Sequence, residues 1–362
     1  MFTLRMRAAL IGLCAAATVS VPGAAADEPF YKGKRLAVLV NYAAGGPTDI
    51  EGRLLAKHIA RHIEGQPAIV VQNMDGAGGL IGTGYLGEIA PKDGTMMGYL
   101  TGAAWVYATE PDKLRVDFKS YEFIAYQPGT AVYYVRTDVK PGMKDAADIV
   151  KAKGLISGGL AIDNAKDLLI RLTLDILGVP YRHVTGYRSN AAARLALQRG
   201  EISFFSESPP GYRSVVEPSM VKAGQVIPLY YDPGYDGENL SVPKQVEGLA
   251  MLPFPELYRK IKGAQPSGQL WDVYLAGLTI NAAMQRLIVL PPRAPQAAVE
   301  ALRAAVLRLN ADPAFAEDAT KAMGFVPQYE AGPQTNKQVR QALTVRPEIR
   351  AFVADYIKSG KK

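Results

Sequence analysis

The sequence predicts an α/β protein of two lobes, each a mainly parallel sheet flanked by helices. In the first half, strand-like apolar runs alternate with helix-like segments; strands are expected at 36–40, 68–72 and 95–100, and helices at 50–63 and 80–90. This βαβαβ order is typical of a parallel sheet. The alternation starts again from about Tyr121, which indicates a second lobe.

The second half contains the remaining predicted elements. Strands are expected at 131–136, 155–159, 181–185, 202–205, 226–230, 276–280 and 286–290, and helices at 144–153, 164–177, 191–199, 295–310 and 345–357. The segment 209–266 is rich in proline, glycine and tyrosine and otherwise gives weak signals. A chain of 362 residues is longer than one hydrophobic core usually serves. We therefore expect a discontinuous first lobe, 27–127 and 271–362, and a second lobe, 128–270.

The first 26 residues have the three parts of a secretory signal. Arg5 and Arg7 precede an apolar run at 8–21, and three alanines end the segment at Ala26. We expect cleavage near Ala26 and a periplasmic location. The one cysteine, Cys14, lies inside this segment and follows Leu13, where a lipid-attachment site would have a small residue. The mature chain is therefore expected to have no disulfide and no thiolate metal site.

Charge and composition narrow the classes of partner. The formal net charge is +7, and the basic residues are scattered apart from a small cluster at 358–362. A nucleic-acid surface is not expected from this distribution, whereas a mild positive field favours anionic solutes. We expect no cofactor and a monomer.

The segment after the first strand has the composition of a ligand-binding loop. Glycines there permit backbone angles that other residues avoid, and small side chains let a ligand approach the N–H groups that begin the next helix. Pro47, Thr48 and Asp49 suit a first-turn proline, a hydroxyl and a capping carboxylate. The candidate binding residues of this first loop are Tyr42, Ala43, Ala44, Gly45, Gly46, Thr48 and Asp49.

Two more loops of small residues follow the second and third strands. Carboxyl ends of parallel strands meet at one edge of a sheet, where ligands collect. Three such loops at one edge favour an anion site over ordinary turns. The candidates in these two loops are Gly76, Ala77, Gly78, Thr101, Gly102 and Ala103.

Polar and small residues also follow strands of the second lobe, where they could face the first-lobe loops across a cleft. Arg188 is a natural counter-charge for a carboxylate, and Tyr42, Trp105, Tyr107 and Tyr187 could form cleft walls. The second-lobe candidates are Ser157, Gly158, Gly159, Asp163, Asn164, Tyr187, Arg188, Ser206 and Glu207.

Residue patterns for catalysis are weak. His58 and His62 are four residues apart on one predicted helix, but two ligands do not make a metal site, so we expect a solvent-facing or boundary pair. No Gly-x-Ser-x-Gly is present, and Ser208 has no visible base. Pro47 and Thr48 stand where a phosphate-binding P-loop needs a lysine and a hydroxyl residue. Binding is therefore favoured over turnover.

Four motifs in this order resemble the solute receptors of tripartite tricarboxylate transporters, the Bug family. They are Ala-Ala-Gly-Gly-Pro-Thr-Asp at 43–49, Gln-Asn-Met-Asp-Gly-Ala-Gly-Gly at 72–79, Pro-Lys-Asp-Gly-Thr at 91–95, and the stretch 183–205. The resemblance covers the mature chain. It implies a two-lobed periplasmic binding protein, type II-like, that closes on a small organic acid and delivers it to integral-membrane transporter subunits. It also implies that 42–49 and 157–164 hold a ligand carboxylate through backbone N–H groups and water.

Departures from the family pattern indicate a divergent branch. Met74 and Asp75 replace a common Arg-Pro, the segment 185–189 replaces Pro-Tyr-Lys-Gly, and Asp163 and Asn164 stand where many members carry serine or histidine. The identity of the acid and its number of carboxylates stay open. The alternatives are an exported α/β enzyme acting on a small acid and a sensory partner that reports ligand to a membrane kinase.

Overall fold

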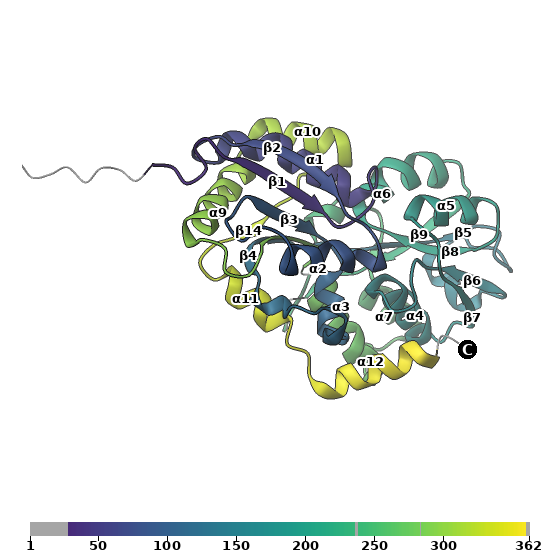
Figure 1. Cartoon of the computed structure of the whole chain (residues 1–362). Helices are drawn as coiled ribbons and strands as arrows, with labels where there is room; N and C mark the ends of the chain where they lie inside the picture. Colours follow the sequence, from purple (N-terminus) through teal and green to yellow (C-terminus); the bar gives the residue numbers. More distant parts are fainter. Residues whose placement is uncertain (1–27, 236–237, 283, 360–362) are drawn as a thin grey trace, which may run out of the picture.

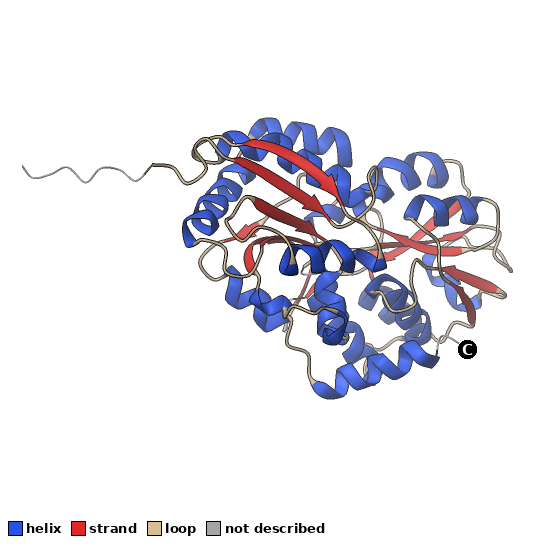
Figure 2. Cartoon of the chain, viewed as in Figure 1, coloured by secondary structure: helices blue, strands red, loops and turns tan. Residues whose placement is uncertain are grey.

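The computed structural model describes residues 28–235, 238–282 and 284–359 and divides them into two α/β lobes, each with a six-stranded sheet (Figures 1 and 2). The secretory segment predicted at 1–26 lies outside the described residues. Within the described residues, no helix is both long enough and apolar enough to span a bilayer.

The first sheet has the strand order β14-β4-β13-β3-β1-β2. Strands β1, β2 and β3 are parallel neighbours, whereas β13 runs antiparallel to both β3 and β4. Because β13 comes from the C-terminal part of the chain, the first lobe is discontinuous in sequence. Its strands are β1 (Arg35–Val40), β2 (Ala68–Asn73), β3 (Met96–Leu100), β4 (Glu122–Gln127), β13 (Arg286–Leu290) and β14 (Glu330–Ala331).

The second sheet has the order β12-β9-β5-β8-β6-β7. Strand β5 is antiparallel to β8 and β9, whereas β6 pairs in parallel with β7 and β8. A short hairpin pairs β10 (Gly234–Tyr235) with β11 (Leu240–Ser241). The strands of the sheet are β5 (Val132–Arg136), β6 (Leu155–Gly158), β7 (Tyr181–Val184), β8 (Phe204–Glu207), β9 (Val226–Tyr231) and β12 (Leu252–Pro253).

Helices flank both sheets (Figure 2). They are α1 (Pro47–Ile59), α2 (Leu80–Glu88), α3 (Ala103–Thr109), α4 (Ala165–Leu177), α5 (Asn190–Gln198), α6 (Pro209–Gly211), α7 (Phe254–Lys262), α8 (Gln269–Gly277), α9 (Gln296–Asn310), α10 (Pro313–Met323), α11 (Thr335–Ala342) and α12 (Pro347–Ser359). Two π-helical stretches follow α6 and α8, at Tyr212–Val221 and Leu278–Ala282.

Burial explains why β1 is apolar along its whole length. Leu36, Val38 and Val40 pack in one core with α1, α9 and α10, while Leu39 packs in a second core on the opposite face. A strand covered on both faces needs apolar residues at consecutive positions. The second core continues without a break into the second lobe, through Trp105 of α3.

The last helix connects the lobes. Figure 1 shows α12 beneath both, and it contacts α3 of the first lobe and α8, which packs against α4 of the second lobe. Arg350 donates to the Ala108 carbonyl of α3 at 3.1 Å, and Arg171 of α4 donates to the Tyr356 carbonyl at 2.8 Å. These contacts hold the C-terminal segment against both lobes.

Some element predictions were wrong. The strand expected at 276–280 is helical, because α8 packs against α4, with Gly277 close to Leu169, and the π-helical turn after it contacts α3. Strand β4 and helices α3, α10 and α11 were not predicted, and the helix expected at 144–153 is a 3₁₀ segment at Ala146–Lys151. A short apolar run suits a buried helix as well as a strand, so packing decides between them.

Candidate functional site

The three small-residue loops of the first lobe are joined by a residue that the sequence analysis did not select, Asn41. Its side chain is fully buried and donates to the carbonyls of Gly79 at 3.2 Å and Thr101 at 2.9 Å. Its Oδ1 accepts from the Thr101 N–H at 3.0 Å. One amide therefore connects the ends of β1, β2 and β3, and the predicted meeting of these loops at one sheet edge is present.

Asp49 organises the first loop from within. Its carboxylate accepts from the Gly45 N–H at 2.8 Å, from Arg53 Nε at 3.0 Å and from Asn73 Nδ2 at 2.9 Å. Burial alone would raise the pKa of Asp49, but these hydrogen bonds outweigh it and hold the pKa below its usual value. Because its oxygens are occupied, Asp49 shapes the loop; it lies inside the first turn of α1 and bonds to an N–H that precedes the helix, so it is not the N-cap of α1.

Two of the N–H groups of the first loop are left open toward solvent, whereas those of Gly45 and Gly46 are bonded to Asp49 and to the Ala43 carbonyl. Helix α1 begins with Pro47, and its N-cap, Gly46, has no side-chain cap. Ala43 and Ala44 are exposed, and within the described part of the chain their N–H groups have no acceptor. Free N–H groups at a helix start, with the dipole behind them, favour an anion.

The second loop lies against the first. Tyr42 Oη donates to the Gly78 carbonyl at 3.1 Å, and burial raises the pKa of this phenol, which keeps it protonated. Four consecutive residues, Gly76 to Gly79, have positive φ angles. At Gly79 a side chain would collide with the Asn41 amide, so both the angle and the close approach require glycine.

A buried ion pair supports the third loop from below. Arg286 of β13 donates to Glu51 Oε1 at 2.6 Å and to Thr101 Oγ1 at 3.2 Å. Thr101 Oγ1 also donates to the Gln285 carbonyl at 2.7 Å. Thr101 is thereby fixed by two residues of the C-terminal segment, while Gly102 and Ala103 begin α3 beside it.

In the second lobe, Ser157, His183 and Asp167 form a chain of hydrogen bonds. Ser157 Oγ lies 2.9 Å from His183 Nδ1, and His183 Nε2 lies 3.0 Å from Asp167 Oδ2. Asp167 also accepts from the Leu160 N–H at 2.7 Å. Ser157 is fully buried. The chain of contacts instead fixes the loop that contains Gly158 and Gly159.

Gly159 shows how tightly that loop is held. A Cβ at this position would collide with the Asp167 carboxylate. Its N–H donates to the Val184 carbonyl at 2.8 Å, and its carbonyl accepts from the Tyr187 N–H at 3.3 Å. Tyr187 is therefore placed beside the Ser157 to Gly159 loop, whereas the neighbouring Arg188 side chain is exposed.

Ser206 and Glu207 end β8 in a cluster of charged groups. Glu207 is fully buried, ion-paired with Arg194, and accepts from Asn190 Nδ2 at 2.8 Å. Lys166 of α4 donates to Asn190 Oδ1 at 2.9 Å and to the Ser206 carbonyl at 2.7 Å. Burial lowers the pKa of Lys166 to about 8, against the opposing influence of Glu207. The Glu207 carboxylate is therefore already paired within the lobe, whereas the Lys166 ammonium is bonded to neutral oxygens.

The loop edges of the two lobes meet at Asp163. Trp105 Nε1 of α3 donates to the Asp163 carbonyl at 3.2 Å, and Lys113 is ion-paired with its carboxylate at 2.8 Å. Asn164 caps α4 by accepting from the Asp167 N–H at 2.8 Å. Both residues therefore lie at the contact between lobes. Tyr107 does not join the cluster through its hydroxyl, which donates to Asp117 at 2.6 Å.

The two helical histidines contact different carboxylates. His58 is buried, with Nε2 2.8 Å from Asp318, and His62 Nε2 lies 2.7 Å from Asp312. The predicted boundary position is correct for His62, which is partly exposed. The predicted solvent-facing or boundary position is wrong for His58, which is buried. Among the described residues, no group of three or more His, Cys, Asp or Glu side chains is arranged to hold a metal ion.

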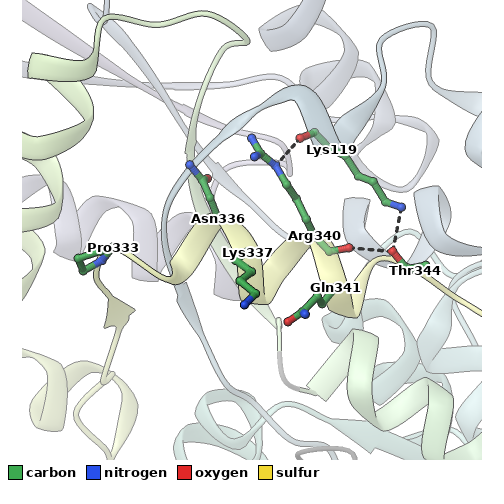
Figure 3. A pocket seen from close by; sticks show the side chains of 7 residues that line it. All are labelled: Lys119, Pro333, Asn336, Lys337, Arg340, Gln341 and Thr344. Atoms are coloured by element: carbon green, nitrogen blue, oxygen red, sulfur yellow. Dashed lines mark hydrogen bonds between the residues drawn. The ribbon is translucent and has the colours of Figure 1, made fainter.

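A separate surface pocket lies on the first lobe, away from the glycine loops. It has a volume of about 490 Å³ and contains none of the predicted binding residues. Figure 3 shows Arg340 bonded to the Lys119 carbonyl and Lys119 bonded to Thr344, so two of its cations hold the wall together. The pocket is therefore distinct from the candidate anion site.

Sequence reasoning missed the residues that support the loops from outside them. Asn41 precedes the glycine motif directly, and a buried amide before three glycine loops is a signal that could have been used. Arg286 and Lys166 gave no such signal, because their partners lie far along the chain. The supporting residues are Asn41, Glu51, Asn73, Lys166, Asp167, His183, Asn190, Arg194 and Arg286.

Two α/β lobes with glycine-rich loops at adjoining sheet edges define the fold of a periplasmic binding protein. Solved structures with this fold include the periplasmic binding protein BugD, with a TM-score of 0.65 and 20% identity over 90% of this chain and 98% of that one. A TctC solute-binding protein from Polaromonas has a TM-score of 0.59 and 18% identity, covering 90% and 99%. MatC from Rhodopseudomonas palustris with bound malate has a TM-score of 0.56 and 16% identity, covering 91% and 99%.

Sequence comparison adds one curated relative. The UPF0065 protein in the TAR-I ttuE-ttuC' intergenic region of Agrobacterium vitis is 31% identical over 191 residues, 49% of this chain and 53% of that protein. The chain thus spans about half the length of this relative. No family model matches. The fold of this chain is that of the Bug and TctC solute-binding proteins, which confirms the fold that the resemblance implied.

Proposed function

We propose that this chain is a periplasmic solute receptor that binds a small organic carboxylate between its lobes and delivers it to a tripartite tricarboxylate-type membrane transporter. One observation carries the proposal: Asn41 joins three glycine loops at the carboxyl ends of three parallel strands. That edge offers the open N–H groups of Ala43 and Ala44. MatC, which shares the fold, has bound malate.

In the proposed ligand seat, some residues contact the ligand and others shape the loops that do so. In the first lobe, the ligand would contact the backbone of Tyr42 to Gly46, Gly76 to Gly78 and Thr101 to Ala103. In the second lobe, it would contact the loop from Ser157 to Asn164 and the neighbouring Tyr187 and Arg188. Asp49 and Glu207 would act by shaping these loops, because their carboxylates are already occupied.

The proposal also includes export of the chain and the bounds of the two lobes. The N-terminal 26 residues would direct the chain to the periplasm, and lobes at 27–127 with 271–362 and at 128–270 would close on the ligand. A ligand that contacts both lobes binds the closed form better and so shifts the population toward it. The closed pair of lobes would then be the form that the transporter subunits contact.

Thermal unfolding with a panel of acids tests the proposal. The chain from Asp27 onward is heated with mono-, di- and tricarboxylates, aromatic acids, and the amides of each. Ligand at about 100 times its dissociation constant adds about 2.7 kcal/mol to stability, so a bound acid raises the midpoint clearly. A rise with one group of acids but not with their amides supports the receptor. No rise with any acid contradicts carboxylate binding.

A further inference from the structure

The C-terminal helix α12 joins the two helices that begin at the proposed ligand loops. Helix α3 starts at Ala103, in the third loop of the first lobe, and α4 starts at Ala165, directly after the second-lobe loop that ends at Asn164. Figure 1 shows α12 running from beneath α3 toward α4. A single helix is therefore placed to fix the spacing between the two sets of loops.

Two attachments hold α12, one toward each end. Near its start, Arg350 Nε donates to the Ala108 carbonyl of α3 at 3.1 Å. Near its end, the Tyr356 carbonyl accepts from Arg171 of α4 at 2.8 Å, and the Tyr356 hydroxyl donates to Asp175 of the same helix. Each attachment joins α12 to a different lobe.

The attachment to the second lobe involves a buried cation. Arg171 is only 4% exposed, and its guanidinium lies 4.3 Å from the centre of the Tyr356 ring. Its Nη1 has no hydrogen-bond partner among the described residues. A buried charge that loses an acceptor is costly, so releasing Tyr356 from Arg171 is unfavourable.

Helices α3 and α4 are also tied at the loop edge, because Trp105 Nε1 donates to the Asp163 carbonyl just before α4. On the other side, α12 buries one stripe, Ile349, Val353 and Ile357, in the core that continues through both lobes. If the lobes move apart, the Trp105 contact breaks and α12 must give up one of its two attachments. The attachments of α12 therefore favour the arrangement in which the lobes touch.

We propose that α12 is a strut and that Arg350, Arg171 and Tyr356 are positioning residues: through α12 they hold α3 and α4 at the spacing at which loops of both lobes contact one ligand. The inference rests on the proposed function. A ligand binds more weakly when the competent arrangement is only a fraction of the population, and its apparent affinity falls by that fraction. Loosening either end of α12 should thus weaken binding while both loops stay intact.

Calorimetric titration of Arg171→Gln and Arg350→Gln tests the strut, using the acid of the thermal panel that raises the unfolding midpoint most. Each variant should lose at least about fivefold in affinity, as a competent fraction reduced to about one fifth would give. Arg171→Lys keeps a buried donor for the Tyr356 carbonyl and should recover most of the affinity. Arg340→Gln is the matched control, because Arg340 donates to two carbonyls of its own lobe; it should bind as tightly as wild type. Wild-type affinity in both end variants would overturn the strut.

The double variant separates a strut from two local defects. Arg350 and Tyr356 are six residues apart on α12, about 9 Å along its axis, and independent losses at such a distance add. Because a strut fails when either end is free, Arg171→Gln combined with Arg350→Gln should bind no more weakly than the weaker single variant. Full additivity of the two losses would contradict the coupling through α12. Urea unfolding of each variant checks that it is folded during the titration.

An interlobe distance tests the strut without any ligand. Since Cys14 is the single cysteine, the chain from Asp27 onward takes fluorescent labels only at introduced cysteines, here Ala297→Cys on α9 and Lys153→Cys in the second lobe, both exposed. Arg171→Gln should shift the energy-transfer distribution toward longer separations, and an unchanged distribution would overturn the strut. If wild-type protein binds no acid of the panel, the proposed function fails, and this distribution alone still decides for or against the strut.

Discussion

Asn41→Ala should disable the ligand seat without touching a ligand. The Asn41 side chain bonds to Gly79, Thr83 and both backbone groups of Thr101, at 2.9 to 3.3 Å. Truncation leaves the Thr101 N–H and carbonyl without this partner, and a buried group left unpaired costs about 1–3 kcal/mol. We expect a loss of about 3 kcal/mol in the free energy of unfolding, and at least about a tenfold loss of carboxylate affinity because the loops lose their common tie.

Urea unfolding and calorimetric titration measure the two effects. Asn310→Ala is the matched control, because Asn310 also clamps one residue, accepting from the Tyr329 N–H at 3.0 Å and donating to its carbonyl at 2.8 Å. It lies at the end of α9, apart from the glycine loops. The control should lose stability and keep wild-type affinity. If Asn41→Ala binds as tightly as wild type, the loops do not form the seat.

Three further changes probe a buried carboxylate, the contact between lobes and the second-lobe loop. Burial raises the pKa of Asp232 to about 7, against hydrogen bonds from Tyr274 and Tyr133, so the folded state binds this proton more tightly than the unfolded state. Stability should therefore fall as pH rises from about 4 to 7, by at most about 1.4 kcal/mol per unit; urea midpoints of Asp232→Asn should lack this component, and an unchanged slope would contradict it. Ligand should alter Trp105 emission in Trp271→Phe protein, because Trp105 donates to the Asp163 carbonyl of the other lobe; a silent Trp105 would argue against motion there. Gly159→Ala should cost more than about 2 kcal/mol, since its Cβ meets the Asp167 carboxylate, whereas Gly332→Ala meets nothing within 4 Å and should be neutral in urea unfolding.

The sequence was most informative about features that are set by residues close together in the chain. Pro47 and Asp49 were predicted to start a helix, and Pro47 does so while Asp49 reaches back to the Gly45 N–H, four residues away. Likewise, strand and helix alternation predicted β1, α1, β2, α2 and β3, because each is set by local apolar periodicity.

Contacts between distant residues could not be predicted in this way. Arg286 supports Thr101 from 185 positions away, and Lys166 reaches the Ser206 carbonyl across 40. Nothing in the local sequence of either cation indicates its partner. Glu207 was expected to face a ligand, and its position at a strand end was right, but its pairing with Arg194 became visible only in the fold.

Backbone resonances of glycine test the central claim most directly. The chain from Asp27 onward is labelled with ¹⁵N-glycine, and the amides are followed as the tightest-binding acid is added. The account predicts that shifts concentrate at Gly45, Gly46, Gly76, Gly78 and Gly102, with smaller changes at Gly158 and Gly159, and none at distant Gly142 or Gly224. Shifts centred on Gly332, beside the surface pocket, or no shift in the first-lobe loops, would contradict a carboxylate seat built from backbone N–H groups.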